Sequence, residues 1–348
     1  MAWRSTPAAG GRPTLRGMAR SHLTLAALAT AAVAGLDVTS ASGFGSGARG
    51  DFESALLNTR DGRHWIVRVP TSERAEAEQS ADLVALRALS TGVRARLPFA
   101  VSNFAGQTPI GGTRAVVYDF VFGSPLELAG IAEGSPLAPA LGRAIAAIHT
   151  LPTSFVADAG LPVHSPVEIL QSTITIMDRA SATNLVPAAL LGRWEKATED
   201  GPLWQFAPTV INGGLSADSF LTSDDEVTGL LGWQSLSVGD PARDLYWLLS
   251  ARGEYVAETA FDAYNEARGS SDRQVKHRAM LYAELEIAKW LLHGTQERST
   301  EIVDDAVQML HGLVDTVQND LDQTLSHNTM PVMAVEEVEA MLDRDRRA

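Results

Sequence analysis

Short runs rich in apolar and β-branched residues, a pattern typical of β-strands, recur between residues 36 and 122. The clearest run is WIVRV at residues 65–69, and Asp61-Gly62 just before it is a turn signal. Helical periodicity interrupts the runs once, at residues 72–89. We therefore expect a mainly antiparallel sheet with one inserted helix. The predicted strands are residues 36–40, 52–58, 64–69, 99–104 and 114–122.

From residue 136 the apolar positions recur every three or four residues, which indicates helices. Leu141, Ile145 and Ile148 share one face of the first helix, and Ser135 is expected to cap its start. This change of period predicts an α+β protein whose second part is helical. The other predicted helices are residues 166–178, 187–199, 254–268, 273–293 and 300–323.

These patterns divide the chain into two lobes with a segment at each end. We expect a small antiparallel-sheet lobe at residues 23–122 and a larger helical lobe at residues 123–323. Residues 1–22 are rich in Arg, Gly, Pro and Ala and are predicted to be a disordered extension. Residues 324–348 are predicted to be a charged, mobile tail.

Composition argues against nucleic-acid binding and excludes sites that depend on cysteine. The 348 residues carry a formal charge of -14 and no long Lys/Arg run, which argues against binding nucleic acid. The acidic surface either favours a small cationic ligand or serves solubility. Because cysteine is absent, disulfides, zinc-thiolate sites and thiol nucleophiles are excluded, and the chain suits a reducing cytoplasm.

An apolar run at residues 23–36 follows Arg12, Arg16 and Arg20, which is the outline of a signal peptide. The run is too short to span a bilayer. The alternative is a helix that covers the first lobe. We expect the helix, no membrane association and a cytoplasmic protein, and an exported binding protein is the competing hypothesis.

The most informative segment is residues 210–245. It reads VINGGLSADSFL at 210–221, LGW at 231–233 and GDPARDL at 239–245. This layout resembles the catalytic segment of the aminoglycoside and macrolide phosphotransferases, whose pattern is H-G-D-x-H-x-x-N, then I-D-W, then G-D-P-x-x-D-L. The resemblance covers residues 23–320 and implies a two-lobed, protein-kinase-like fold. Shorter matches in the same order occur at residues 65–70, 117–120, 147–152 and 290–294.

The resemblance also assigns roles, and this chain lacks the side chains for them. In the family the first Asp is the base toward the substrate hydroxyl, and the Asn and the second Asp hold magnesium for ATP. Those positions are Gly214, Ser219 and Gly232 here, and Asn212 stands in the place of the first His. Glycine supplies no base and no metal ligand, so no intact catalytic set is predicted and magnesium binding is expected to be weak or absent.

Three carboxylates of the same segment are possible substitutes. Asp218 lies beside the position of the lost Asn, and Asp240 and Asp244 belong to the G-D-P-x-x-D element. The resemblance implies that Asp240 and Asp244 hold backbone amides of the catalytic region. Recruitment of any of the three as a metal ligand remains the alternative.

Nucleotide-binding candidates lie in the first lobe. Gly45, Gly47 and Gly50 form a G-x-G-x-x-G pattern between two predicted strands, which suits a hairpin loop over phosphates or a plain flexible loop. Arg68 occupies the place where kinases have the phosphate-pairing Lys, and the alternative is an arginine on a strand that faces solvent. The acid that would pair with Arg68 is expected among Glu73, Glu76, Glu78 and Asp82.

Polar residues on the later helices have two interpretations. Glu284, Glu286 and the pair at residues 304–305 lie where the family binds cationic substrates, or else they form a solvated face. His149 and His293 are expected to be buried and hydrogen-bonded rather than ligands.

The leading hypothesis is a pseudokinase-like member of the family that binds a nucleotide, a small molecule or a protein, with phosphotransfer lost or greatly weakened. The first alternative is an active ATP-dependent small-molecule O-phosphotransferase of the antibiotic type that uses the displaced acids. The second is the exported binding protein.

Overall fold

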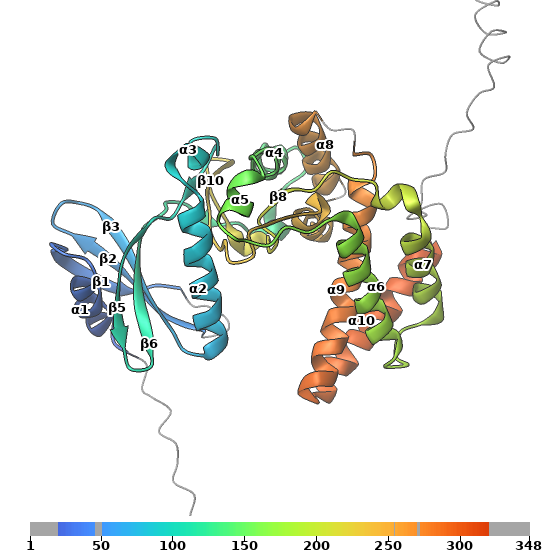
Figure 1. Cartoon of the computed structure of the whole chain (residues 1–348), viewed down its shortest axis with the longest axis horizontal. Coiled ribbons are helices and arrows are strands. Elements are labelled where there is room, and N and C mark those ends of the chain that lie inside the picture. Colours follow the sequence, from blue (N-terminus) through green and yellow to red (C-terminus); the bar gives the residue numbers. More distant parts are fainter. Residues whose placement is uncertain (1–19, 46–50, 254, 270–271, 320–348) are drawn as a thin grey trace, which may run out of the picture. The chain divides into compact units, whose positions relative to one another are not determined.

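The computed structural model describes residues 20–45, 51–253, 255–269 and 272–319 (Figure 1). Its contacts form two compact units. Among the described residues, the first contains those up to Leu83 together with Ser102–Phe120, and the second contains Val84–Val101 and those from Val121 onward. Residues 84–101, expected in the first lobe, thus group with the second. The predictions for residues 1–19 and 324–348 lie outside the described residues.

The first unit is an antiparallel five-stranded sheet in the order β1-β2-β3-β6-β5. The turn between β2 and β3 contains Gly62 at φ +79°, so the turn signal and the predicted antiparallel sheet are confirmed. The predicted helix at 72–89 is α2, Glu73–Ala88. The strands are β1 (Val38–Gly43), β2 (Phe52–Thr59), β3 (His64–Pro70), β5 (Phe104–Ile110) and β6 (Thr113–Asp119).

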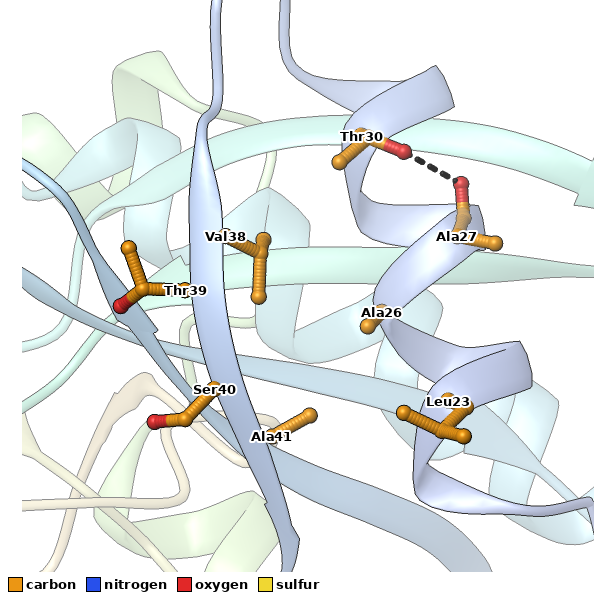
Figure 2. A pocket seen from close by; sticks show the side chains of 8 residues that line it. All are labelled: Leu23, Ala26, Ala27, Thr30, Val38, Thr39, Ser40 and Ala41. Carbon is orange, nitrogen blue, oxygen red and sulfur yellow. Dashed lines mark hydrogen bonds between the residues drawn. The ribbon is translucent and has the colours of Figure 1, made fainter.

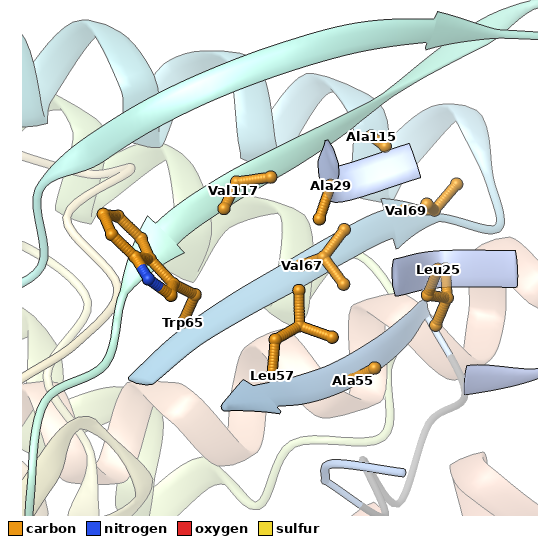
Figure 3. Packing of buried hydrophobic residues seen from close by; sticks show 9 residues of the cluster. All are labelled: Leu25, Ala29, Ala55, Leu57, Trp65, Val67, Val69, Ala115 and Val117. Carbon is orange, nitrogen blue, oxygen red and sulfur yellow. The ribbon is translucent and has the colours of Figure 1, made fainter. Parts of the chain in front are cut away.

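Helix α1 (His22–Ala32) covers one face of this sheet (Figure 3). Its start is capped by Ser21, whose hydroxyl accepts the Thr24 N–H at 3.2 Å. The helix contributes Leu25 and Ala29 to the core, so the prediction that the apolar run folds onto the first lobe is confirmed. Alternate strand residues complete the core: Ala55, Leu57, Trp65, Val67, Val69, Ala115 and Val117.

The second unit contains two small sheets. One has the order β4-β10-β9-β7, and in the other β8 pairs with β11. The strand predicted at 99–104 was wrong as a single element, because β4 pairs in parallel with β10 and the chain then enters β5 of the other unit. The strands are β4 (Ala100–Val101), β7 (Ser124–Pro125), β8 (Thr209–Ile211), β9 (Phe220–Ser223), β10 (Glu226–Leu230) and β11 (Ser237–Gly239).

Helices make up the rest of the second unit, as predicted. The closest pair is α4 (Leu137–His149) with α8 (Val256–Arg268), where a Cβ at Gly142 would lie 2.1 Å from the Ala260 carbonyl oxygen. The N-cap position of α4 is Pro136, one residue later than expected, but the Ser135 hydroxyl accepts the Leu137 N–H at 3.2 Å. The others are α3 (Thr91–Arg94), α5 (Ser154–Asp158), α6 (Pro166–Ser181), α7 (Ala188–Glu199), α9 (Val275–Glu297) and α10 (Thr300–Asn319), with 3-10 turns η1 (Leu128–Gly130), η2 (Gly201–Trp204), η3 (Ala217–Ser219), η4 (Pro241–Asp244) and η5 (Tyr246–Ser250).

Together the antiparallel sheet of the first unit and the helices of the second confirm the predicted fold class. Within the described part of the chain, no helix combines the length and the apolar character needed to cross a membrane.

Candidate functional site

The motif at residues 210–245 folds as a loop and a hairpin within the second unit. Strand β8 leads into the loop at 212–214, and η3 then precedes the β9–β10 hairpin. Asp224 and Asp225 form the hairpin turn at φ +52° and +60°, and β11 returns antiparallel to β8. The three positions that lack catalytic side chains therefore lie in the loop after β8, on η3 and just after β10.

Asn212 ties two of these positions together. Its side chain is fully buried, and its Oδ1 accepts the Gly214 N–H at 3.2 Å. Its Nδ2 donates to the Gly232 carbonyl oxygen at 2.9 Å. Asn212 thus serves as a bridge between the loop after β8 and the turn after β10, a role that the sequence did not reveal.

Gly214 and Gly232 differ in whether a side chain could be introduced there without strain. A Cβ at Gly214 would meet the Ser235 Oγ at 3.4 Å, an ordinary contact, and Gly214 has no positive φ. Gly232 lies at φ +75°, where L-residues are strained, and a Cβ there would lie 3.3 Å from the Gln234 Oε1. The backbone conformation at position 232 therefore favours glycine over an L-residue such as Asp.

Asp244 is committed to holding the loop. Its carboxylate accepts the backbone N–H groups of Asn212 at 2.7 Å and Gly213 at 2.8 Å, and His149 Nε2 lies 3.2 Å from Oδ2. Tyr264 contacts the other ring nitrogen of His149 at 2.9 Å, and burial raises the pKa of this phenol. Both carboxylate oxygens are thus used inside the protein, and His149 is buried as expected. The same prediction was wrong for His293, which is exposed on α9 with its ring stacked on that of Trp290.

Asp240 is equally committed, to an arginine of α9. Arg278 donates to it through Nε at 2.7 Å and NH2 at 3.0 Å, and the Tyr282 hydroxyl and the Ala242 N–H also donate to it. Arg278 also donates to Asp272 at 2.6 Å. Burial acts to lower the pKa of Arg278, but Asp240 and Asp272 outweigh it and raise the pKa.

The remaining motif residues form no metal-binding group. Asp218 is exposed on η3, and the Ser219 hydroxyl accepts the Ser216 N–H at 3.2 Å. In the described ranges of the chain, no three His, Cys, Asp or Glu side chains lie together as metal ligands would.

The predicted nucleotide-binding residues lie in the first unit. The Arg68 guanidinium stacks on the Phe52 ring at 3.9 Å from its centroid. The phenol of Tyr118 has a raised pKa because it is buried, and Asp82 raises that pKa further while Arg68 lowers it. Asp82 and Arg68 thus both act on the Tyr118 phenol, and the acid that would pair with Arg68 stays a prediction among the four candidates. Gly45 has φ +73°, and Gly47 and Gly50 lie outside the described residues.

Glu284 is not open to a cationic ligand. It accepts hydrogen bonds from Arg193 at 3.0 Å and from the Trp194 indole at 2.8 Å, between α7 and α9. Burial raises the pKa of Glu284, and Arg193 opposes that shift. Two other acids that the sequence singled out also have partners. Glu286 on α9 pairs with Lys289, and Asp305 on α10 accepts the Trp290 indole N–H.

An apolar groove lies between α1 and β1 (Figure 2). None of its lining residues is charged, so these residues offer neither a phosphate ligand nor a metal ligand. They are Leu23, Ala26, Ala27, Thr30, Val38, Thr39, Ser40 and Ala41.

Comparisons with known proteins agree with this geometry. The family described as "Phosphotransferase enzyme family" matches residues 41–282. The uncharacterized protein YcbJ of Bacillus subtilis (strain 168) is 25% identical over 275 residues, which cover 74% of this chain and 87% of that protein. The macrolide 2'-phosphotransferase MphH from Brachybacterium faecium is similar in structure, with a TM-score of 0.68 and 22% identity over 83% of this chain and 98% of that one. The GDP complex of aminoglycoside 2'-phosphotransferase-IIIa has a TM-score of 0.69 and 19% identity over 86% and 100%.

Proposed function

Because the chain belongs to the phosphotransferase enzyme family, we propose that it is a member that binds a nucleotide but transfers its phosphate poorly or not at all. One observation carries the proposal. Gly214, Ser219 and Gly232 replace the base and the metal ligands, while Asp240 and Asp244 use their carboxylates in buried hydrogen bonds.

Phosphoryl transfer depends on positioning and on neutralising the charge of the transferred group. Metal ions do this through hard oxygen ligands, and a carboxylate orients the attacking hydroxyl. A single neutral hydroxyl at Ser219 meets neither need. Asp218, which is exposed, is the substitute that the packing leaves available.

Two observations make a nucleotide the proposed ligand: the position of Arg68 and the nucleotides bound in solved structures that resemble this chain. Structural neighbours include a GDP complex and an ADP-bound aminoglycoside phosphotransferase. Arg68 supplies a half-buried cation on the sheet of the first unit, which can neutralise phosphate without metal. ATP binding that depends little on magnesium follows from these features.

A thermal-shift titration with ATP, with and without magnesium, tests this proposal. We expect ATP to raise the melting temperature by nearly the same amount in both conditions, and no phosphorylation of aminoglycosides or macrolides. Robust magnesium-dependent turnover that Asp218→Ala abolishes would instead establish an active kinase that uses a displaced acid. A melting temperature that ATP leaves unchanged would contradict nucleotide binding.

We also propose that the protein is cytoplasmic, because the apolar run that outlines a signal peptide forms α1 and buries Leu25 and Ala29 in the sheet core. Mass spectrometry of the native protein should find α1 retained in a cytoplasmic fraction. A mature N-terminus near Gly43 in a secreted fraction would contradict this and favour export.

A further inference from the structure

The face of the five-stranded sheet opposite α1 carries Arg68. Side chains alternate along each strand, so residues that neighbour the core positions point to this second face. Ser54 pairs with Arg68 across β2 and β3. The N–H of Phe44 donates to the Ser54 carbonyl at 3.2 Å, which places Phe44 in the same cross-strand row.

Phe120 belongs to a different row at the other end of β3. Its N–H donates to the His64 carbonyl at 3.1 Å, and its ring lies 6.0 Å from the His64 ring. The rings of Phe44 and Phe120 nevertheless meet edge to face, with centroids 5.9 Å apart and planes at 81°. The two side chains therefore lean toward each other across the sheet.

Leu56 and Ile66 pair with each other in the cross-strand row that lies between the rows of Phe44 and Phe120. Ile66 is only 9% exposed and Leu56 is half-buried, although both lie on the face away from α1. Phe44 itself is 39% exposed, so its ring can leave without opening the core.

We propose that the Phe44–Phe120 contact is an autoinhibitory bridge over this face, and that a nucleotide whose phosphates pair with Arg68 binds there only when the bridge opens. This inference rests on the proposed nucleotide-binding function and specifies its regulation. Apparent affinity falls in proportion to the open fraction of the protein. Because an edge-to-face aromatic pair contributes a modest free energy, the bridge is expected to weaken nucleotide binding about two- to tenfold.

The first test is a calorimetric titration of ATP without magnesium into the wild type and Phe44→Ala. The variant is expected to bind about two- to tenfold more tightly, because its open state costs less. Leu23→Ala is the matched control, since Leu23 is an exposed apolar residue on the α1 side of the same unit. It should bind ATP like the wild type.

A second measurement detects the bridge without any ligand. The natural chain has no cysteine, so Leu56→Cys introduces a single thiol in the row between those of Phe44 and Phe120. Its modification by a disulfide reagent should accelerate severalfold when Phe44→Ala is added. An unchanged rate would overturn the bridge.

The two measurements separate the possible failures. Faster thiol modification with unchanged or weaker ATP binding by Phe44→Ala would overturn the autoinhibition while leaving nucleotide binding intact. Failure of every variant to bind ATP would overturn both this inference and the nucleotide role in the proposed function.

Discussion

Asp240→Ala is expected to lower the free energy of unfolding by about 3–5 kcal/mol, because it leaves a buried arginine without its main counter-charge. Arg278 and Asp240 are both fully buried, and Arg278 donates two hydrogen bonds to this carboxylate. The Tyr282 hydroxyl and the Ala242 N–H lose their acceptor as well. Urea unfolding followed by tryptophan fluorescence measures the change.

Asp218→Ala is the matched control for this prediction. It removes a carboxylate from the same motif, but one that is exposed, so we expect a change within about 0.5 kcal/mol. If both substitutions change the free energy of unfolding equally, Asp240 does not stabilise the fold through Arg278. Asp240 would then again be a candidate metal ligand.

Restoring Gly214→Asp, Ser219→Asn and Gly232→Asp together is expected to create magnesium-dependent ATP binding. A Cβ at position 214 meets only ordinary contacts, so an L-residue can enter there without strain at its Cβ. At position 232 the left-handed backbone costs about 1–2 kcal/mol for an L-residue, although Asp tolerates it better than most. Single restorations should do little, because these groups act as a unit.

The readout is the melting temperature with ATP in the presence and absence of magnesium. Ligand at about 100 times its Kd stabilises a protein by about 2.7 kcal/mol, which gives a shift of several degrees. Gly232→Ala is the control, since it places an L-residue on the same left-handed backbone without a carboxylate. A triple variant that shows no magnesium effect while Gly232→Ala remains folded would mean that the frame no longer supports metal binding.

Local patterns sufficed to predict much of the fold. Runs of apolar and β-branched residues and the Asp61-Gly62 turn predicted β2 and β3 to within a residue or two, because side-chain type and turn chemistry are local. The strand at 99–104 failed because its two halves pair with different sheets. Which partner a two-residue strand such as β4 chooses depends on residues far along the chain, and no local period records that.

The site divides in the same way. The motif showed that positions 214 and 232 lack carboxylates, because the sequence alone gives the residue type at each position. It did not show that Arg278, 38 residues after Asp240, would neutralise it, although an arginine on the apolar face of a predicted helix was a usable signal. The bridging role of Asn212 depends on the Gly232 carbonyl and could not be read from either residue alone.

The packing of α1 has a practical consequence for producing the protein. The family match begins at residue 41, so a recombinant fragment trimmed to that boundary would lack α1. Leu57, Val67 and Val117 pack against this helix and would face water on one side of the sheet. An exposed apolar face of this kind promotes aggregation. Fragments intended for binding assays should therefore begin before Ser21, so that the helix and its cap remain attached to the sheet.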